Sequence, residues 1–384
     1  MNKAYVLGVS MTKFAPNVKM RLEELGAEAV WGALEDAGMD LKGIQGVYCG
    51  NVFRRVGIGQ RIMTEAGHTG MPITNIENAC ASGSCALREA YFAVAQDRYD
   101  VCLAIGVEIR PDRFSGPMGD ETDLEGAQGL MFPALYALRA KRYMFEYGLK
   151  PAHLAQIAVN NRKNAYYNEK SSFGELIDID TVLKSRMVAD PLHLYDCNPV
   201  SDGAAAAVVV NEKTARRLGG KPVEILASSL TSGSLEAGFI DMTFEEMTHR
   251  AAQEAYHQAG CGPEKIDFAE VHDCFTIAEI LRVEGLGFCE RGGMISWIED
   301  GTIAISGKKP INPSGGLLGK GHPLGATGIA QIYEICKQVR GEAGKRQIEG
   351  ARVGLAMNRG GVTPGIEGNA CTIHILRAPQ KWTR

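Results

Sequence analysis

The sequence predicts an α/β fold built from two related halves. Short β-branched runs alternate with amphipathic helical stretches, as in residues 100–108 (DVCLAIGVE) against residues 22–38 (LEELGAEAVWGALEDAG). Such alternation is typical of α/β proteins. A segment near the N-terminus also recurs in the second half of the chain. The 384 residues, 45% of them hydrophobic, suffice for two domains with large cores.

The first half begins with an apolar run near the N-terminus that predicts a β-strand and is too short for a signal peptide or a membrane span. Residues 27–51 predict a helix, a short loop and a second strand. Residues 78–91 (NACASGSCALREAY) begin with small residues and then take helical spacing. Residues 100–108 complete this half with a buried strand.

The domain organisation follows from an interruption in the alternation of strands and helices. Residues 113–195 are rich in Gly, Asp and Pro and predict an inserted, mostly helical loop domain. We therefore expect one half over 1–112, with residues 196–222 returning to it, and a second half over 223–384.

Two internal matches support the duplication. In the first match, each copy predicts a helix closed by a C′ glycine and followed by a strand. Residues 27–51 and 250–274 share five identical residues at one constant offset: Ala29/Ala251, Ala33/Ala255, Ala37/Ala259, Gly38/Gly260 and Ile44/Ile266. A second match pairs Cys80 with His322, Gly83 with Gly325 and Tyr91 with Tyr333. The alternative is chance similarity between alanine-rich helices, but two matches in the same order favour duplication. Related halves would bring equivalent helix N-termini to one common site.

Charge and cysteine content exclude several classes of function. The net charge is −4 and Lys and Arg are dispersed, so the chain lacks the basic surface that nucleic-acid binding requires. The ten cysteines include no C-x-x-C pair, which argues against a structural zinc site and a disulfide framework. We expect a protein of a reducing cytoplasm, in which a special cysteine has a chemical role.

Cys80 is the candidate nucleophile. It lies just before the helix that follows the small residues, and a thiol at a helix N-terminus has a lowered pKa. The alternative is a buried cysteine that acts as a small hydrophobic residue. Cys85, inside the same helix, fits that alternative.

Two further segments supply candidate partners. Residues 315–328 (GGLLGKGHPLGATG) surround His322 with glycines, so the backbone can bend closely around an imidazole placed at a helix start. Residues 271–274 (VHDC) place His272, Asp273 and Cys274 at the end of the repeated strand, where sites of α/β proteins are usually built. Asp273 alone could instead cap the next helix.

Taken in order, these motifs resemble the thiolase family. Cys-x-Ser-Gly opens a helix, SDGAAAAVVV occupies residues 201–210, GHPLGATG occupies residues 321–328, and a glycine-rich strand end lies at residues 358–361. The HDCF sequence at residues 272–275 resembles the sterol-carrier-protein type, which includes acetyl-CoA acetyltransferase-like chains. The resemblance implies the thiolase fold, a duplicated five-layered αβαβα arrangement with an inserted loop domain. It implies coenzyme A as a substrate, with no metal and no further cofactor.

The resemblance also implies roles for individual residues. Cys80 would form the covalent acyl-enzyme, and His322 would help to generate its thiolate and line an oxyanion hole. His272 would be a second donor to the thioester oxygen, and Cys274 would move protons. The backbone N–H groups of Cys80 and Gly360 would form the second oxyanion hole.

Near the C-terminus the sequence departs from the family pattern. Degradative and biosynthetic thiolases carry an acid/base cysteine where this chain has Asn358, which cannot carry a proton, so the role would pass to Cys274. Arg359 is unusual at this place. One hypothesis is that Arg359, with Arg110 or Arg113, binds a carboxylate on the substrate. Such a substrate would be a dicarboxylic ester such as benzoylsuccinyl-CoA. The alternative is that the side chain of Arg359 points outward or supports the loop.

The predicted function is thiolytic cleavage of a 3-oxoacyl-CoA, or the reverse Claisen condensation. An alternative is a thiolase-like retro-aldol lyase or C-acyltransferase, although such lyases lose the residues corresponding to Cys80 and His322. Another is a catalytic subunit that needs a small accessory chain with an OB fold and a zinc ribbon. The resemblance implies a homodimer or higher oligomer, and we expect no partner membrane or nucleic acid.

Overall fold

The structure is a computed structural model that describes residues 2–53, 56–110, 124–234, 241–361 and 368–379. The strands are β1 Ala4–Met11, β2 Gly46–Gly50, β3 Ile73–Ile76, β4 Val101–Glu108, β5 Met187–Ala189, β6 Leu192–His193, β7 Gly203–Asn211, β8 Val223–Thr231, β9 Phe268–Glu270, β10 Val353–Gly360 and β11 Ala370–Arg377. The α-helices are α1 Leu22–Ala37, α2 Ile58–Ala66, α3 Ser82–Ala95, α4 Leu124–Ala127, α5 Phe132–Tyr147, α6 Pro151–Tyr166, α7 Ile179–Lys184, α8 Glu212–Leu218, α9 Glu246–Ala259, α10 Thr276–Gly285, α11 Met294–Glu299, α12 Gly316–Lys320 and α13 Thr327–Arg340. Four short 3₁₀ turns are η1 Leu41–Gly43, η2 Leu194–Asp196, η3 Pro263–Lys265 and η4 Gly344–Arg346.

Nine strands are hydrogen-bonded in the order β3-β2-β4-β7-β1-β8-β11-β10-β9. The contact between β1 and β8 is limited to two residue pairs, Tyr5 with Glu224 and Val6 with Val223. By contrast, β1 and β7 pair along most of their length. The sheet therefore consists of two parts, β3-β2-β4-β7-β1 and β8-β11-β10-β9, joined at one narrow seam.

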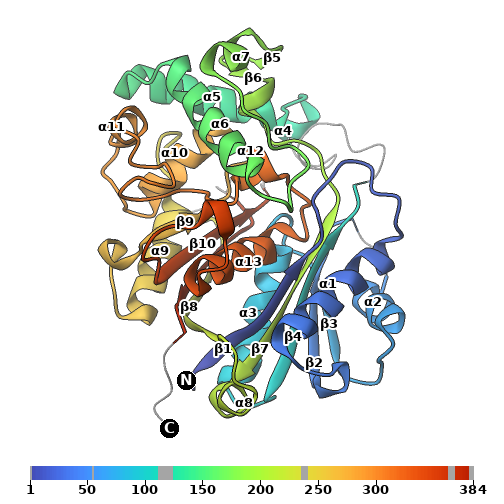
Figure 1. Cartoon of the computed structure of the whole chain (residues 1–384). Helices are drawn as coiled ribbons and strands as arrows, with labels where there is room; N and C mark the ends of the chain where they lie inside the picture. The colour runs from blue at the N-terminus through green and yellow to red at the C-terminus, as the bar shows by residue number, and fades with distance from the viewer. Residues whose placement is uncertain (1, 54–55, 111–123, 235–240, 362–367, 380–384) are drawn as a thin grey trace.

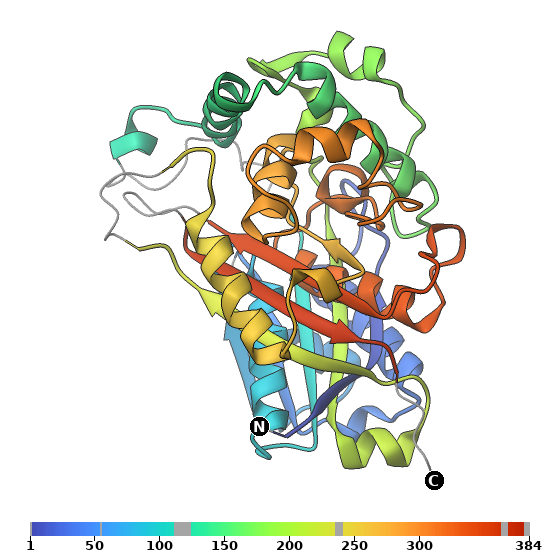
Figure 2. The ribbon, with the colours of Figure 1, turned by 90° about the vertical axis from the view of Figure 1, so that its left-hand side faces the viewer.

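The helices arrange these two sheet parts into five layers (Figure 1). Helix α1 packs on the outer face of the first part, and α9 packs on β8 and β11 of the second. Helices α3 and α13 lie between the two parts and contact each other. Figure 2 shows α9 in front of the red strands β10 and β11. The five-layered arrangement predicted from the sequence is confirmed.

Both copies of the first internal match have the same local structure. Helices α1 and α9 each end at a left-handed glycine, Gly38 with φ 62° and Gly260 with φ 65°. Each is followed by a 3₁₀ turn and a strand, β2 in the first copy and β9 in the second. Only glycine takes this conformation without a steric cost, which explains why the repeated sequence keeps it.

The second match corresponds to the two central helices, with one difference. Helix α3 begins two residues after Cys80, whereas α13 begins only at Thr327, after a turn in which the backbone N–H of Ala326 donates to the carbonyl of Pro323. His322 thus lies in the loop between α12 and α13, not at a helix start as predicted.

The described part of the predicted loop domain, residues 124–195, is mostly helical and carries the small β5–β6 pair. Its helices α5 and α6 pack on α10, α11 and α12, which follow β9 in the chain. The predicted domain boundaries themselves stay a prediction. Among the described residues, no helix has the length and apolar content to cross a bilayer.

Candidate active site

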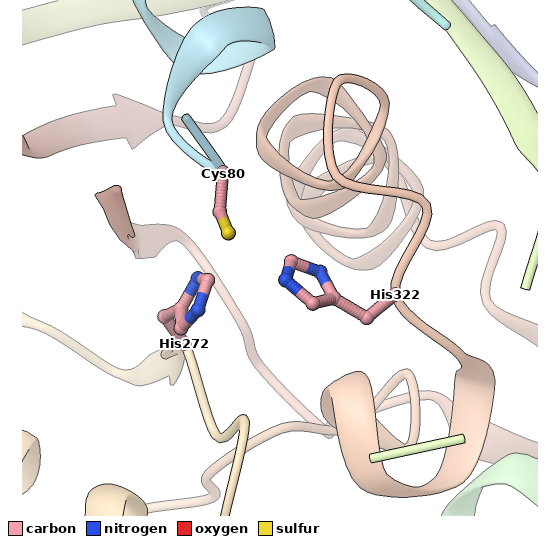
Figure 3. Close-up of side chains that lie close together, drawn as sticks. All are labelled: Cys80, His272 and His322. Atoms are coloured by element: carbon pink, nitrogen blue, oxygen red, sulfur yellow. The ribbon is translucent and has the colours of Figure 1, made fainter. Parts of the chain in front are cut away.

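Cys80, His272 and His322 meet in one place, although they come from three separate segments (Figure 3). The sulfur and one ring nitrogen of each histidine all lie within 4.8 Å of one another. The two imidazole rings stand nearly perpendicular, with centroids 4.9 Å apart and an interplanar angle of 88°. The fold therefore brings together three of the residues that the sequence predicts for the site.

The backbone around Cys80 is tightly wound. Ala79 has a positive φ of 47°, which is rare for a residue with a side chain. The N–H of Ala81 donates to the carbonyl of Asn78, and that of Ser82 donates to the carbonyl of Ala79. This turn leads directly into α3 and points the sulfur toward the two imidazoles (Figure 3). Such strain is typical of functional sites and persists because the surrounding structure enforces it.

The thiol of Cys80 is protonated at rest, contrary to the prediction from its position before a helix. Burial, and after it the charge of Cys274, raises the pKa of Cys80 to about 12, although the backbone N–H of Gly361 acts to lower it. The nucleophile therefore needs a base that removes its proton.

His322 is suited to be that base. Its Nδ1 lies 2.7 Å from Oγ1 of Thr327, and this hydroxyl donates its own proton to the carbonyl of Pro323 at 2.9 Å. Thr327 can therefore only accept at this contact, so Nδ1 carries the hydrogen and Nε2 has the free lone pair. Burial, together with the charge of Arg282, lowers the pKa of His322 to about 3, which keeps the ring neutral.

His272 is neutral as well. Burial lowers its pKa well below 6.5, His322 and Arg282 lower it further, and the side chain of Asn358 raises it. The carboxamide of Asn358 donates to Gln331 at 3.1 Å, and that of Gln331 donates to the carbonyl of Met357 at 3.0 Å. Oδ1 of Asn358 is buried without a hydrogen-bond partner among the described residues, and the effect of Asn358 on the pKa of His272 is that of an acceptor close to the ring. Asn358 therefore acts on an imidazole rather than as a proton carrier.

Cys274 follows His272 and lies against a buried guanidinium. Nη1 of Arg282 is 3.5 Å from the sulfur of Cys274 and also donates to the backbone carbonyl of His272. The charge of Cys274 raises the pKa of Cys80, so the two sulfurs are close enough to interact. This is the relation expected between a nucleophile and a neighbouring proton carrier.

Asp273 caps a helix, but a different one from the helix expected. Its carboxylate accepts the backbone N–H groups of Leu317 at 2.7 Å and Leu318 at 3.3 Å, at the start of α12 rather than α10. It also accepts a hydrogen bond from Asn161 at 2.9 Å. Because α12 leads directly to His322, Asp273 ties the segment of His272 to the segment of His322.

One backbone N–H group that follows β10 acts on the sulfur of Cys80. This N–H belongs to Gly361. This contact is to the sulfur and not to a substrate oxygen, so the oxyanion roles of the Cys80 and Gly360 N–H groups stay predictions.

The two described arginines of the substrate hypothesis have carboxylate partners within the protein. Arg359 is 5% exposed and forms an ion pair of 2.5 Å with Glu245. This favours the interpretation in which Arg359 supports its loop rather than binding a substrate. The charge of Asp202 acts on Arg110, whose backbone N–H also donates to that carboxylate. Arg113 lies outside the described residues.

The spacing of Cys80, His272 and His322 would also allow the three to share a metal ion. The local charge opposes this use of the site. The positive charges of Arg282 and Arg359 contribute to the lowered pKa of His272, so they would also repel a dication placed there. The same charges favour anions, such as a thiolate or an enolate, which suits acyl chemistry.

Sequence reasoning missed Thr327 and Arg282. Thr327 looks like an ordinary helix residue, and its role depends on the loop that folds His322 back onto it. Arg282 offers a weak signal, because it is a cation within an otherwise apolar stretch, Ile280 to Val283, and is only 1% exposed. Its contact with Cys274 cannot be deduced from spacing alone.

Comparisons with known proteins agree with this geometry. A family model described as "Thiolase, N-terminal domain" matches residues 4–213, and one described as "Thiolase C-terminal domain-like" matches residues 233–368. The acetyl-CoA acetyltransferase of Methanothermobacter thermautotrophicus is 42% identical over 98% of this chain and 100% of its own. Sterol carrier protein 2 of Homo sapiens is 38% identical over 94% of this chain and 70% of its own.

Two further relatives are informative. The benzoylsuccinyl-CoA thiolase subunit BbsB of Thauera aromatica is 36% identical over 90% of this chain and 91% of its own. The solved structure of the Ltp2-ChsH2(DUF35) aldolase superimposes with a TM-score of 0.86 at 27% identity, covering 99% of both chains. These similarities extend over nearly the whole sequence rather than one motif.

Proposed function

The chain belongs to the thiolase family, and from that premise we propose that it transfers an acyl group from a 3-oxoacyl-CoA to coenzyme A through a thioester on Cys80. The observation that carries this proposal is the cluster of Cys80, His272 and His322 within 4.8 Å, with the free lone pair of His322 fixed by Thr327. A protonated thiol beside a neutral imidazole of fixed tautomer is the arrangement that nucleophilic catalysis requires.

The first half-reaction makes the acyl-enzyme. The proton of Cys80 passes to Nε2 of His322 as the sulfur attacks the 3-oxo carbon of the substrate. The backbone N–H groups of Cys80 and Gly360 stabilise the resulting oxyanion, as the family resemblance implies. The bond between C2 and C3 then breaks, and C2 receives a proton from Cys274. The C1–C2 fragment leaves as acetyl-CoA when C2 carries no substituent, and the shortened acyl group remains on Cys80.

The second half-reaction regenerates the enzyme. The thiol of coenzyme A gives its proton to Cys274, and its sulfur attacks the carbonyl of the acyl-enzyme. The bond to Cys80 breaks, and the sulfur of Cys80 takes back the proton held by His322. Each proton carrier thus returns to its starting state. The reverse sequence is the Claisen condensation.

The thioester oxygen of the enolate faces the two imidazoles. After His322 has taken the proton of Cys80, its Nε2–H can donate to that oxygen, so one group acts as base and then as donor. His272 was expected to be a second donor. Because Asn358 acts on its ring, we propose that this contact sets which nitrogen of His272 faces the substrate.

For partners, we propose coenzyme A and acyl-CoA substrates, a homo-oligomer and a separate accessory subunit. The accessory subunit is supported by two relatives, since BbsB is named as a subunit and the superimposed aldolase structure pairs Ltp2 with ChsH2. The ten described cysteines are all unpaired, which supports a reducing compartment such as the cytoplasm.

The decisive experiment combines product analysis with a covalent trap. The purified protein is mixed with a panel of 3-oxoacyl-CoA esters, with and without coenzyme A, and both products and peptides are followed by mass spectrometry. We expect two acyl-CoA products and an acyl adduct on the Cys80 peptide. Cys80→Ser should abolish both, whereas Cys85→Ser, a change at a buried cysteine of α3, should preserve them. Turnover by Cys80→Ser would contradict the proposal.

A retro-aldol lyase is the second candidate, because the superimposed structure is that of an aldolase. The two functions differ in their need for Cys80. Retro-aldol cleavage of a 3-hydroxyacyl-CoA would proceed without added coenzyme A and survive Cys80→Ser. The tight cluster around Cys80 favours the thiolase reaction, which needs the sulfur.

A further inference from the structure

We propose that Arg282 is a positioning residue that stabilises the ionised sulfur of Cys274 and so makes Cys274 an effective proton carrier. This inference rests on the proposed function, because it concerns the group that moves protons in both half-reactions. It adds a residue that acts through Cys274 rather than on the substrate.

Arg282 is held rigidly against Cys274. Its side chain is 1% exposed and extends from α10. Nη1 reaches both the sulfur of Cys274 at 3.5 Å and the carbonyl of His272, while Nη2 donates to the hydroxyl of Tyr136 at 2.8 Å. Because the guanidinium is planar, these contacts fix its orientation. A permanent positive charge therefore stands beside the sulfur.

The carboxylate nearest to Arg282 is shared with other cations. Oε2 of Glu245 lies 3.6 Å from Nε of Arg282, beyond hydrogen-bond distance. The other oxygen of Glu245 is paired with Arg139 at 3.1 Å and Arg359 at 2.5 Å. One carboxylate thus faces three guanidiniums. A buried cation stabilises an anion placed beside it, so Arg282 favours a negative sulfur when Cys274 gives up its proton.

The other ionisable groups near Cys274 remain protonated when it ionises. They are Tyr136 on α5, Cys197 after η2, and Cys80 before α3. A charge on Cys274 raises the pKa of each of them, after the larger effect of burial, to about 12. Arg282 is the cation that faces the sulfur from α10. Arg282 thus faces one sulfur that becomes negative during turnover, after Cys274 has given its proton to C2 and until coenzyme A returns one.

The experiment measures the reactivity of each sulfur without substrate. Wild-type protein, Arg282→Lys and Arg282→Met are treated with iodoacetamide between pH 6 and 9, and the alkylated peptides are quantified by mass spectrometry. At pH 7 we expect Cys274 of the wild type to react at least about 10-fold faster than Cys80, because the thiolate is the reactive form. Arg282→Met should slow Cys274 by about 10-fold or more, whereas Arg282→Lys, which keeps the charge, should stay within about 3-fold of the wild type.

Turnover gives an independent readout. Arg282→Met should lower kcat for thiolysis by about 100-fold with little change in KM, and Arg282→Lys should restore most of it. If the alkylation rate of Cys274 is the same in Arg282→Met and the wild type, the inference is wrong. If Arg282→Met fails to fold, the wild type alone still tests the inference. Equal alkylation rates of Cys80 and Cys274 at pH 7 would overturn it.

Failure of the inference is distinct from failure of the proposed function. Acetyl transfer from acetyl-CoA to Cys80 is measured on the same wild-type sample. An acetyl adduct together with an unreactive Cys274 would remove only the role of Arg282. The absence of an adduct would remove the proposed function, whatever the reactivity of Cys274.

Discussion

At the scale of single residues, hydrogen bonds and burial determine where the protons of the site reside. A helix N-terminus favours a thiolate by about 0.3–1 kcal/mol. Burial opposes it more strongly, because raising the pKa of Cys80 from 9.0 to about 12 corresponds to about 4 kcal/mol. Burial therefore prevails, and the sulfur depends on His322 for its activation. The position of Cys80 before a helix predicted the wrong charge state for its sulfur, because position in the sequence does not show that burial outweighs the effect of the helix N-terminus.

The hydroxyl of Thr327 should be important for catalysis without touching the substrate. Thr327→Val removes the acceptor that holds the hydrogen on Nδ1 of His322, so the free lone pair no longer faces Cys80 reliably. We expect acyl-enzyme formation to slow by about 10- to 100-fold, within the range for a general base. Single-turnover acylation of Cys80, followed by rapid quench, measures this effect.

Thr327→Ser is the matched control, because it keeps the hydroxyl and loses only a methyl group. It should acylate at nearly the wild-type rate. Equal rates for the Val variant and the wild type would show that the tautomer of His322 is set by something other than this contact.

At the scale of secondary-structure elements, the contact between α3 and the loop before α13 sets the distance from Cys80 to His322. Glycines permit this approach. A Cβ on Gly83 would lie 2.3 Å from the carbonyl oxygen of Gly325, and one on Gly328 would lie 2.5 Å from the backbone nitrogen of Ser84. Neither backbone can yield without moving a catalytic segment.

Gly83→Ala should therefore both destabilise the protein and disturb the site. We expect a loss of about 1–3 kcal/mol, typical of overpacking, together with slower acylation of Cys80. Gly38→Ala is the control, since Gly38 has a left-handed φ of 62° with nothing within 4 Å and should cost about 1 kcal/mol by backbone strain. Denaturant unfolding and single-turnover acylation of both variants test this. An acylation rate in Gly83→Ala equal to that of Gly38→Ala would contradict it.

The elements themselves were largely predictable from the sequence. Periodicity and the repeated glycines predicted α1, α9 and the strands that follow them, because local chemistry decides these structures. The family motifs indicated Cys80, His272 and His322, which the fold brings together. The start of α13, the target of the Asp273 cap and the partner of Arg359 were not predictable, since each depends on a segment distant in the chain.

At the scale of the whole molecule, the two halves meet through a buried histidine as well as through the catalytic cluster. His374 on β11 is fully buried, and its Nε2 lies 3.0 Å from the hydroxyl of Ser84 on α3. Burial lowers the pKa of His374 to about 4. A neutral histidine at this contact links the stability of the assembled halves to pH.

This link predicts a loss of stability in acid that depends on His374. The folded protein keeps the ring neutral down to about pH 4, whereas the unfolded chain takes up a proton below about pH 6.5. Over that range the unfolded state binds more protons, so the free energy of unfolding rises with pH and is lost as the pH falls. The contribution of this one group approaches about 3 kcal/mol between pH 6.5 and 4.

We expect His374→Gln, which cannot titrate, to gain stability relative to the wild type by that amount on going from pH 7 to pH 4. The neutral His272 and His322 are present in both proteins, so their effects cancel in the comparison. Urea unfolding of both proteins at several pH values measures the difference, and a difference independent of pH would show that folding does not lower the pKa of His374.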